Sequence, residues 1–127
     1  MLASSPRQRL IAVIEDDAAV LHSLEFSLEA QGYRVCPFAR PSDAIESGEI
    51  MAADCLIADY GLPDIDGLTM LKALRDRGLS CPAIIIASTP TIRCRTEAAK
   101  AGAPLLEKPL MGRELDHLLR AMLSAAR

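Results

Sequence analysis

Short apolar runs recur along the chain and alternate with segments of helical spacing. Each run is continuous rather than broken at every second position, which is typical of strands buried on both faces of a parallel sheet. The five runs are LIAVI (10–14), RVCPF (34–38, the weakest), CLIA (55–58), AIIIA (83–87) and PLL (104–106). We therefore predict five strands.

Helical spacing of apolar residues marks the segments between these runs. Three segments carry leucines three or four residues apart: Leu21, Leu24 and Leu28 before Gly32; Leu68, Leu71 and Leu74 before Gly78; and Leu115, Leu118, Leu119 and Met122 near the end. Glycine just after such a pattern is a common helix stop. We predict two further helices, in segments 41–50 and 91–102.

A strand followed by a helix, repeated five times with short connections, defines the expected fold class. Right-handed crossovers place helices on both faces of the sheet, which gives a doubly wound α/β domain. The length of 127 residues fits one such domain. Ligands in these folds bind at the carboxyl ends of the strands, so chemistry is expected there.

Composition excludes several classes of protein. The net charge is −3 and no basic block is present, so the domain itself is not expected to bind nucleic acid. No apolar run approaches the ~20 residues that cross a bilayer, and the start, MLASSPRQR, lacks a signal-peptide core, so we expect a cytoplasmic protein without a membrane segment.

The four cysteines point to no metal or redox chemistry. None forms a Cys-x-x-Cys pair, which makes a zinc site improbable. Four cysteines allow two disulfides, but their place within or beside apolar runs favours reduced, buried thiols.

Polar groups follow the predicted strands where the strands end. Glu15, Asp16 and Asp17 come after the first run, Asp59 after the third, Ser88 after the fourth and Lys108 after the fifth. Carboxylates gathered on a rigid edge suit a hard divalent cation such as Mg²⁺, and a nearby lysine balances further negative charge.

The chain resembles the receiver domains of bacterial two-component response regulators, which share the CheY-like form of the flavodoxin-like fold. The resemblance is carried by VIEDD (13–17), LIADYGLPDIDG (56–67), IIIAST (84–89) and AGAPLLEKP (101–109), in that order. It implies a five-stranded parallel sheet in the order 2-1-3-4-5 flanked by five helices. The receiver domain would cover residues 9–123, with tails at 1–8 and 124–127.

The resemblance also implies roles for individual residues. Glu15 and Asp16 match the acidic pair that holds Mg²⁺, together with Asp59 and the backbone carbonyl of Gly61. Asp59 matches the phosphoacceptor, whose carboxylate attacks a phosphohistidine and forms an acyl phosphate.

Ser88 matches the hydroxyl that contacts the phosphoryl group, and Lys108 matches the ammonium that pairs first with Asp59 and then with that group. The Lys108–Pro109 bond is expected to be cis. Asp17 lies one place beyond the acidic pair, so we interpret it as the N-cap, or a first-turn acid, of the helix that begins near Ala18.

By this resemblance the protein is a signalling phosphoacceptor that catalyses only its own phosphorylation and dephosphorylation. Its expected partners are a sensor histidine kinase or a phosphotransfer protein. An output domain or downstream protein outside this chain, and a phosphorylation-dependent homodimer, are further expectations of the family.

The sequence departs from the family pattern at several positions. Leu105 stands where an aromatic residue usually reports phosphorylation to the output face, which puts that form of signalling in doubt. Thr89 follows the hydroxyl residue where Ala or Gly is common, and would narrow access to Asp59. Pro104 and Leu110 are two further departures.

Three alternative functions can be compared with the sequence. A haloacid-dehalogenase-type phosphatase needs a second Asp two residues after the first, where this chain has Gly61. A nucleotide-binding module needs a Gly-rich or hydroxyl-rich loop after the first strand, and EDDAAV is its electrostatic opposite. A degenerate receiver, acting only as an interaction module without phosphorylation, would normally have lost the acids or the lysine.

Overall fold

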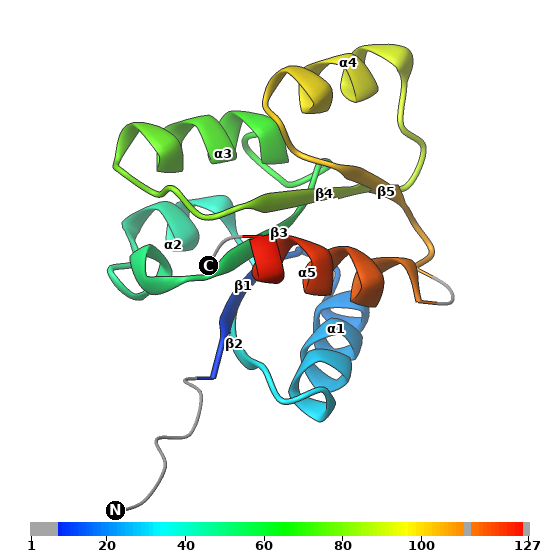
Figure 1. Cartoon of the computed structure of the whole chain (residues 1–127). Coiled ribbons are helices and arrows are strands. Elements are labelled where there is room, and N and C mark those ends of the chain that lie inside the picture. Colours follow the sequence, from blue (N-terminus) through cyan, green and yellow to red (C-terminus); the bar gives the residue numbers. More distant parts are fainter. Residues whose placement is uncertain (1–7, 111–112, 126–127) are drawn as a thin grey trace, which may run out of the picture.

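A computed structural model describes residues 8–110 and 113–125 (Figure 1). In chain order the elements are β1 (Leu10–Ile14), α1 (Ala18–Ala30), β2 (Arg34–Phe38), α2 (Pro41–Glu46), the 3₁₀ helix η1 (Glu49–Ala52), β3 (Cys55–Asp59), α3 (Gly67–Asp76), β4 (Ala83–Ala87), α4 (Ile92–Lys100), β5 (Leu105–Glu107) and α5 (Glu114–Ala125).

The strands form one parallel sheet in the order β2-β1-β3-β4-β5, which confirms the predicted topology. The three central strands are buried along their whole length. Their register brings Ile14 beside Ala58, and Asp59 beside Ile86. The carboxyl ends of the strands therefore meet at one edge of the sheet.

Helices cover both faces of the sheet, and alternate strand residues supply two apolar clusters. Ile14 and Leu56 pack with Leu71 on the α3 side, whereas Val13 and Ile57 belong to the other cluster. That second cluster includes Leu24 and Leu28 of α1 and Leu119 and Leu123 of α5. Figure 1 shows α1 and α5 side by side, with α4 next to β5. Burial on both faces explains why the strands read as continuous apolar runs.

Local signals set the helix boundaries. Asp17 caps α1, because its Oδ1 accepts hydrogen bonds from the backbone N–H groups of Ala19 (2.9 Å) and Val20 (3.2 Å), which confirms the predicted N-cap. Gly32 and Gly78 have φ values of +96° and +107°, a conformation that favours glycine. They lie where the sequence predicted helix stops.

Several boundaries differ from the prediction, three of them for a clear structural reason or by more than one residue. Segment 41–50 is not one helix: α2 ends at Glu46, the chain turns through Ser47 in an extended conformation, and η1 follows. β5 starts at Leu105 rather than Pro104, which has no N–H, although its carbonyl accepts a bond of 2.8 Å from the Ile85 N–H. α5 continues to Ala125, two residues past the predicted domain end. Of the predicted tails at 1–8 and 124–127, residues 1–7 and 126–127 lie outside the described residues.

The four cysteines are free thiols, as the sequence predicted. Burial raises the pKa of Cys55 to about 12, and burial together with a hydrogen bond to Glu49 raises that of Cys36 to about 12. In the described part of the chain, no helix is long and apolar enough to cross a membrane.

Candidate functional site

The first acidic residues lie directly after β1. The Glu15 N–H donates to the Phe38 carbonyl at 3.0 Å, which extends the pairing with β2 by one residue. This pairing leaves the Glu15 side chain fully buried, whereas Asp16 is exposed. The two neighbours therefore face different environments at the same edge of the sheet.

Asp59 is the last residue of β3 and is buried, with 6% of its surface exposed. The Gly61 N–H donates to its Oδ1 at 3.2 Å. One oxygen of the carboxylate is thus held by the loop that follows, while the other meets Lys108.

Lys108 follows β5, the strand at the edge of the sheet, and its side chain reaches the acidic residues. Its backbone N–H donates to the Ala87 carbonyl at 2.8 Å, and the Lys108–Pro109 peptide is cis, as expected. Its Nζ donates to Glu15 Oε1 at 2.9 Å and to Asp59 Oδ2 at 3.2 Å. The ammonium therefore bridges two carboxylates that come from separate strands.

The pKa values of this group follow from burial and pairing. Burial raises the pKa of Glu15, although the hydrogen bonds from Lys108 and from the Asp17 N–H (3.1 Å) act in the opposite direction. Burial alone would lower the pKa of Lys108, but its hydrogen bond to Glu15 and the charge of Asp59 outweigh that cost, so the pKa is raised. Lys108 is therefore firmly charged.

Glu15, Asp16 and Asp59 could together hold a metal ion, because one carboxylate oxygen of each lies within 4.8 Å of the others. When ionised, three carboxylates and one ammonium leave a net charge of −2. All-oxygen donors with excess negative charge match the preference of Mg²⁺. The residues thus fit the predicted ion, and Gly61, the fourth predicted ligand, lies two residues after Asp59.

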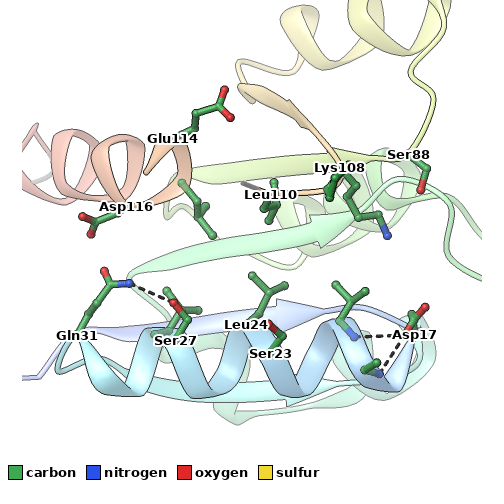
Figure 2. Close-up of a pocket in the computed structure, with 15 residues that line it drawn as sticks. Asp17, Ser23, Leu24, Ser27, Gln31, Ser88, Lys108, Leu110, Glu114 and Asp116 are labelled. Atoms are coloured by element: carbon green, nitrogen blue, oxygen red, sulfur yellow. Dashed lines mark hydrogen bonds between the residues drawn. The ribbon is translucent and has the colours of Figure 1, made fainter. Parts of the chain in front are cut away.

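Ser88 lies just past β4 with its side chain exposed, and it lines the same cavity as Lys108 (Figure 2). Among the described residues, Asp59 accepts hydrogen bonds from Gly61 and Lys108, and none joins it to Ser88. The neighbouring Thr89 is exposed as well. The structure thus brings Glu15, Asp16, Asp59 and Lys108 together and leaves Ser88 at the rim.

Two features of the site escaped sequence reasoning. The pairing of Lys108 with Glu15 was not predicted, because only the contact with Asp59 follows from the family pattern. The second feature is Gly67, where a Cβ would collide with the backbone carbonyl of Asp59 and lie 3.2 Å from the Cα of Tyr60. No sequence signal distinguishes such a close approach from an ordinary turn glycine.

Taken together, the sheet order and an acidic edge bridged by one lysine define a receiver-like α/β domain. The family model of the response regulator receiver domain matches residues 11–120, and the chain belongs to this family.

Curated relatives agree with this assignment. The chain is 33% identical over 119 residues to the transcriptional regulatory protein FixJ of Azorhizobium caulinodans, covering 93% of this chain and 56% of that protein. It is 30% identical over 121 residues to the transcriptional regulatory protein PrrA of Mycobacterium bovis, covering 94% and 51%. The chain thus spans about half the length of these relatives.

Solved structures support the fold independently. A CheY-like response regulator receiver domain from Methanospirillum hungatei superimposes with a TM-score of 0.85 at 23% identity, covering 94% of this chain and 97% of that one.

Proposed function

We propose that this domain accepts a phosphoryl group on Asp59 from a phosphohistidine of a sensor kinase or phosphotransfer protein, in a Mg²⁺-dependent reaction in the cytoplasm. The observation that carries this proposal is the position of Asp59, buried at a strand end 3.2 Å from Lys108 Nζ and next to Glu15 and Asp16. An output domain outside this chain would convert the phosphorylated state into a response.

The residues support phosphoryl transfer in separate ways. Phosphoryl transfer asks the protein mainly for positioning and charge neutralisation. Asp59 is the nucleophile, and the Gly61 N–H holds one of its oxygens while the other remains beside the Lys108 ammonium. Once a phosphoryl group is attached, Lys108 can pair with its oxygens without leaving the site, and Ser88, which lines the same cavity as Lys108, would supply a hydroxyl from the rim.

The proposed metal ligands are Glu15, Asp16, Asp59 and the carbonyl of Gly61, and a bound Mg²⁺ would neutralise charge on the transferred group. The domain would catalyse only its own phosphorylation and dephosphorylation. The degenerate alternative, an interaction module without phosphorylation, receives no support from a site with all its acids and its lysine in place.

Acetyl phosphate tests the proposal without a kinase. With Mg²⁺, the wild-type protein should gain one phosphate by intact mass, and hydroxylamine should remove it as it removes acyl phosphates. Asp59→Asn should abolish the gain, whereas Asp43→Asn, at an exposed position of α2, should not change it. A phosphate that persists in Asp59→Asn would place the acceptor elsewhere.

A further inference from the structure

A groove of about 720 Å³ runs between α1 and α5 and ends beside the acceptor site (Figure 2). Lys108 and Ser88 line one end, together with Asp17, and Gln31 lies at the other. The 13 residues of α1 lie between Asp17 and Gln31, and the rise along the helix from one to the other is about 21 Å. This volume falls within the ~300–1,000 Å³ that is typical of small-molecule sites.

The middle of the groove is apolar. Leu24 of α1 and Leu110 lie toward one another across it, with the hydroxyl of Ser23 nearby (Figure 2). A ligand here would therefore meet aliphatic walls, not ionic partners.

Each of the three acidic residues that line the groove either accepts hydrogen bonds from another group of the protein or points away from α1. Asp17 already accepts two backbone hydrogen bonds as the α1 N-cap. Asp116 pairs with Arg120 at 3.2 Å, and Glu114 points away from α1 in Figure 2. Among the described lining residues, Lys108 is the cation, and it stands at the acceptor end.

We propose that the groove binds the aliphatic chain of medium-chain acyl phosphates, about four to eight carbons long, and that the protein uses these compounds as small phosphodonors in preference to acetyl phosphate. This inference rests on the proposed function of Asp59. The phosphate has to lie at the end where Lys108 and Ser88 stand, and the uncharged chain can then follow the apolar walls toward Leu24 and Leu110.

The transfer balances without any further reactant. An oxygen of the ionised Asp59 carboxylate attacks phosphorus and forms the new O–P bond. The bond between phosphorus and the acyl oxygen breaks, and its electron pair leaves with the fatty carboxylate. No proton has to move, and the released carboxylate departs along the groove.

Donor preference provides the first test. We expect kcat/KM for hexanoyl phosphate to exceed that for acetyl phosphate by about tenfold, since each additional methylene in an apolar site adds to discrimination. Ser23→Trp, which fills the groove from an exposed position on α1, should bring this ratio close to one. The matched control Ser42→Trp, exposed on α2 and away from the groove, should keep the wild-type ratio.

Binding without transfer provides the second test. Hexylphosphonate, a stable probe, should shift the NMR methyl signals of Leu24 and Leu110, whereas methylphosphonate should not. Ser23→Trp should remove these shifts.

The outcomes separate the two proposals. If neither acyl phosphate modifies Asp59, the proposed function fails. If acetyl phosphate modifies Asp59 but the donor ratio is near one, or does not respond to Ser23→Trp, the groove inference is overturned while the proposed function stands. The groove inference is also overturned if hexylphosphonate leaves the Leu24 and Leu110 signals unchanged while a phosphohistidine-bearing protein shifts them. The groove would then be a protein-docking surface.

Discussion

Glu15 is a fully buried carboxylate that receives hydrogen bonds from Lys108 Nζ at 2.9 Å and from the Asp17 N–H at 3.1 Å. Even with both donors, burial raises its pKa above the ordinary value of 4.5. The ionised form is thus less favourable in the metal-free folded protein than in the unfolded chain. A bound divalent cation would reverse this imbalance.

The sign of the pH dependence follows from this shift. Between pH 4.5 and the higher pKa of the folded state, the native protein binds more protons at Glu15 than the unfolded chain does. The contribution of Glu15 to the free energy of unfolding therefore falls as pH rises through this window. We expect Glu15→Gln, without Mg²⁺, to be at least as stable as wild type at neutral pH, with the difference vanishing below pH 4.5.

Urea unfolding in EDTA across this pH range measures the effect, with Asp43→Asn as the control at an exposed carboxylate. A Glu15→Gln protein that is clearly less stable than wild type at neutral pH would show that the pairing with Lys108 outweighs the cost of burial.

At the scale of elements, the start of α3 is fixed by contact with the end of β3. The Gly67 N–H donates to the Tyr60 carbonyl at 2.9 Å, and the helix is capped by Asp66, which accepts from the Thr69 N–H at 2.8 Å. Because Gly67 lies directly against the Asp59 backbone, the first turn of α3 helps to hold the acceptor in place.

Gly67→Ala should therefore disturb both packing and chemistry. We expect a loss of about 1–3 kcal/mol in the free energy of unfolding, as for other overpacked sites, and slower phosphorylation by acetyl phosphate. Gly48→Ala is the matched control, because its φ is −74° and no atom lies within 4 Å of the added Cβ. Equal effects of the two substitutions in urea unfolding would contradict the close-approach explanation.

The sequence predicted elements best where a single physical cause acts locally. The strands could be predicted because both faces of the sheet are covered, which makes their sequences continuously apolar. The start of α1 could be predicted because Asp17 has a side chain suited to capping a helix. The break after Glu46 was missed, since an extended Ser47 and the burial of Ile50 depend on packing against the sheet. The family pattern suggested the members of the site, but the contact between Lys108 and Glu15 depends on how separate strands align.

At the scale of the whole molecule, three carboxylates at the ends of two strands share one edge of the sheet with a single ammonium. Mg²⁺ should bind weakly and relieve their repulsion, which raises the melting temperature because the ion binds the folded state. Asp16→Asn should lose most of this shift and most phosphorylation. Thermal unfolding with and without Mg²⁺ tests this, and an equal shift in wild type and variant would rule out the proposed ligand set.

Leu105 bears on how a structural change at the acceptor site would be transmitted to the rest of the molecule. It is half-buried on β5 and lines a hollow of about 410 Å³ between β5 and α4, where Ala98 and Ala99 contribute only small side chains. Leucine has neither a ring to swing inward nor a hydroxyl to expose. The face formed by α4, β5 and α5 should therefore change little when Ser88 moves toward a phosphoryl group.

Beryllofluoride, a phosphoryl mimic, allows this to be measured by NMR. Amide shifts should be large near Asp59 and Ser88 and modest around Leu105 and along α5. Leu105→Tyr should enlarge the latter, because the hollow beside α4 has room for a ring. Large shifts across that face in the wild-type protein, or tight dimerisation on activation, would show that leucine suffices as the switch.

The sequence distance between Asp59 and Lys108 has a consequence for biosynthesis. These residues are 49 positions apart, and Lys108 lies 93 positions after Glu15. While the chain is being made, the acids of β1 and β3 leave the ribosome well before the cation that bridges them. Until β5 follows, any early pairing of these strands gathers negative charge without its counterion. The group of three carboxylates and one ammonium is thus complete only once β5 docks.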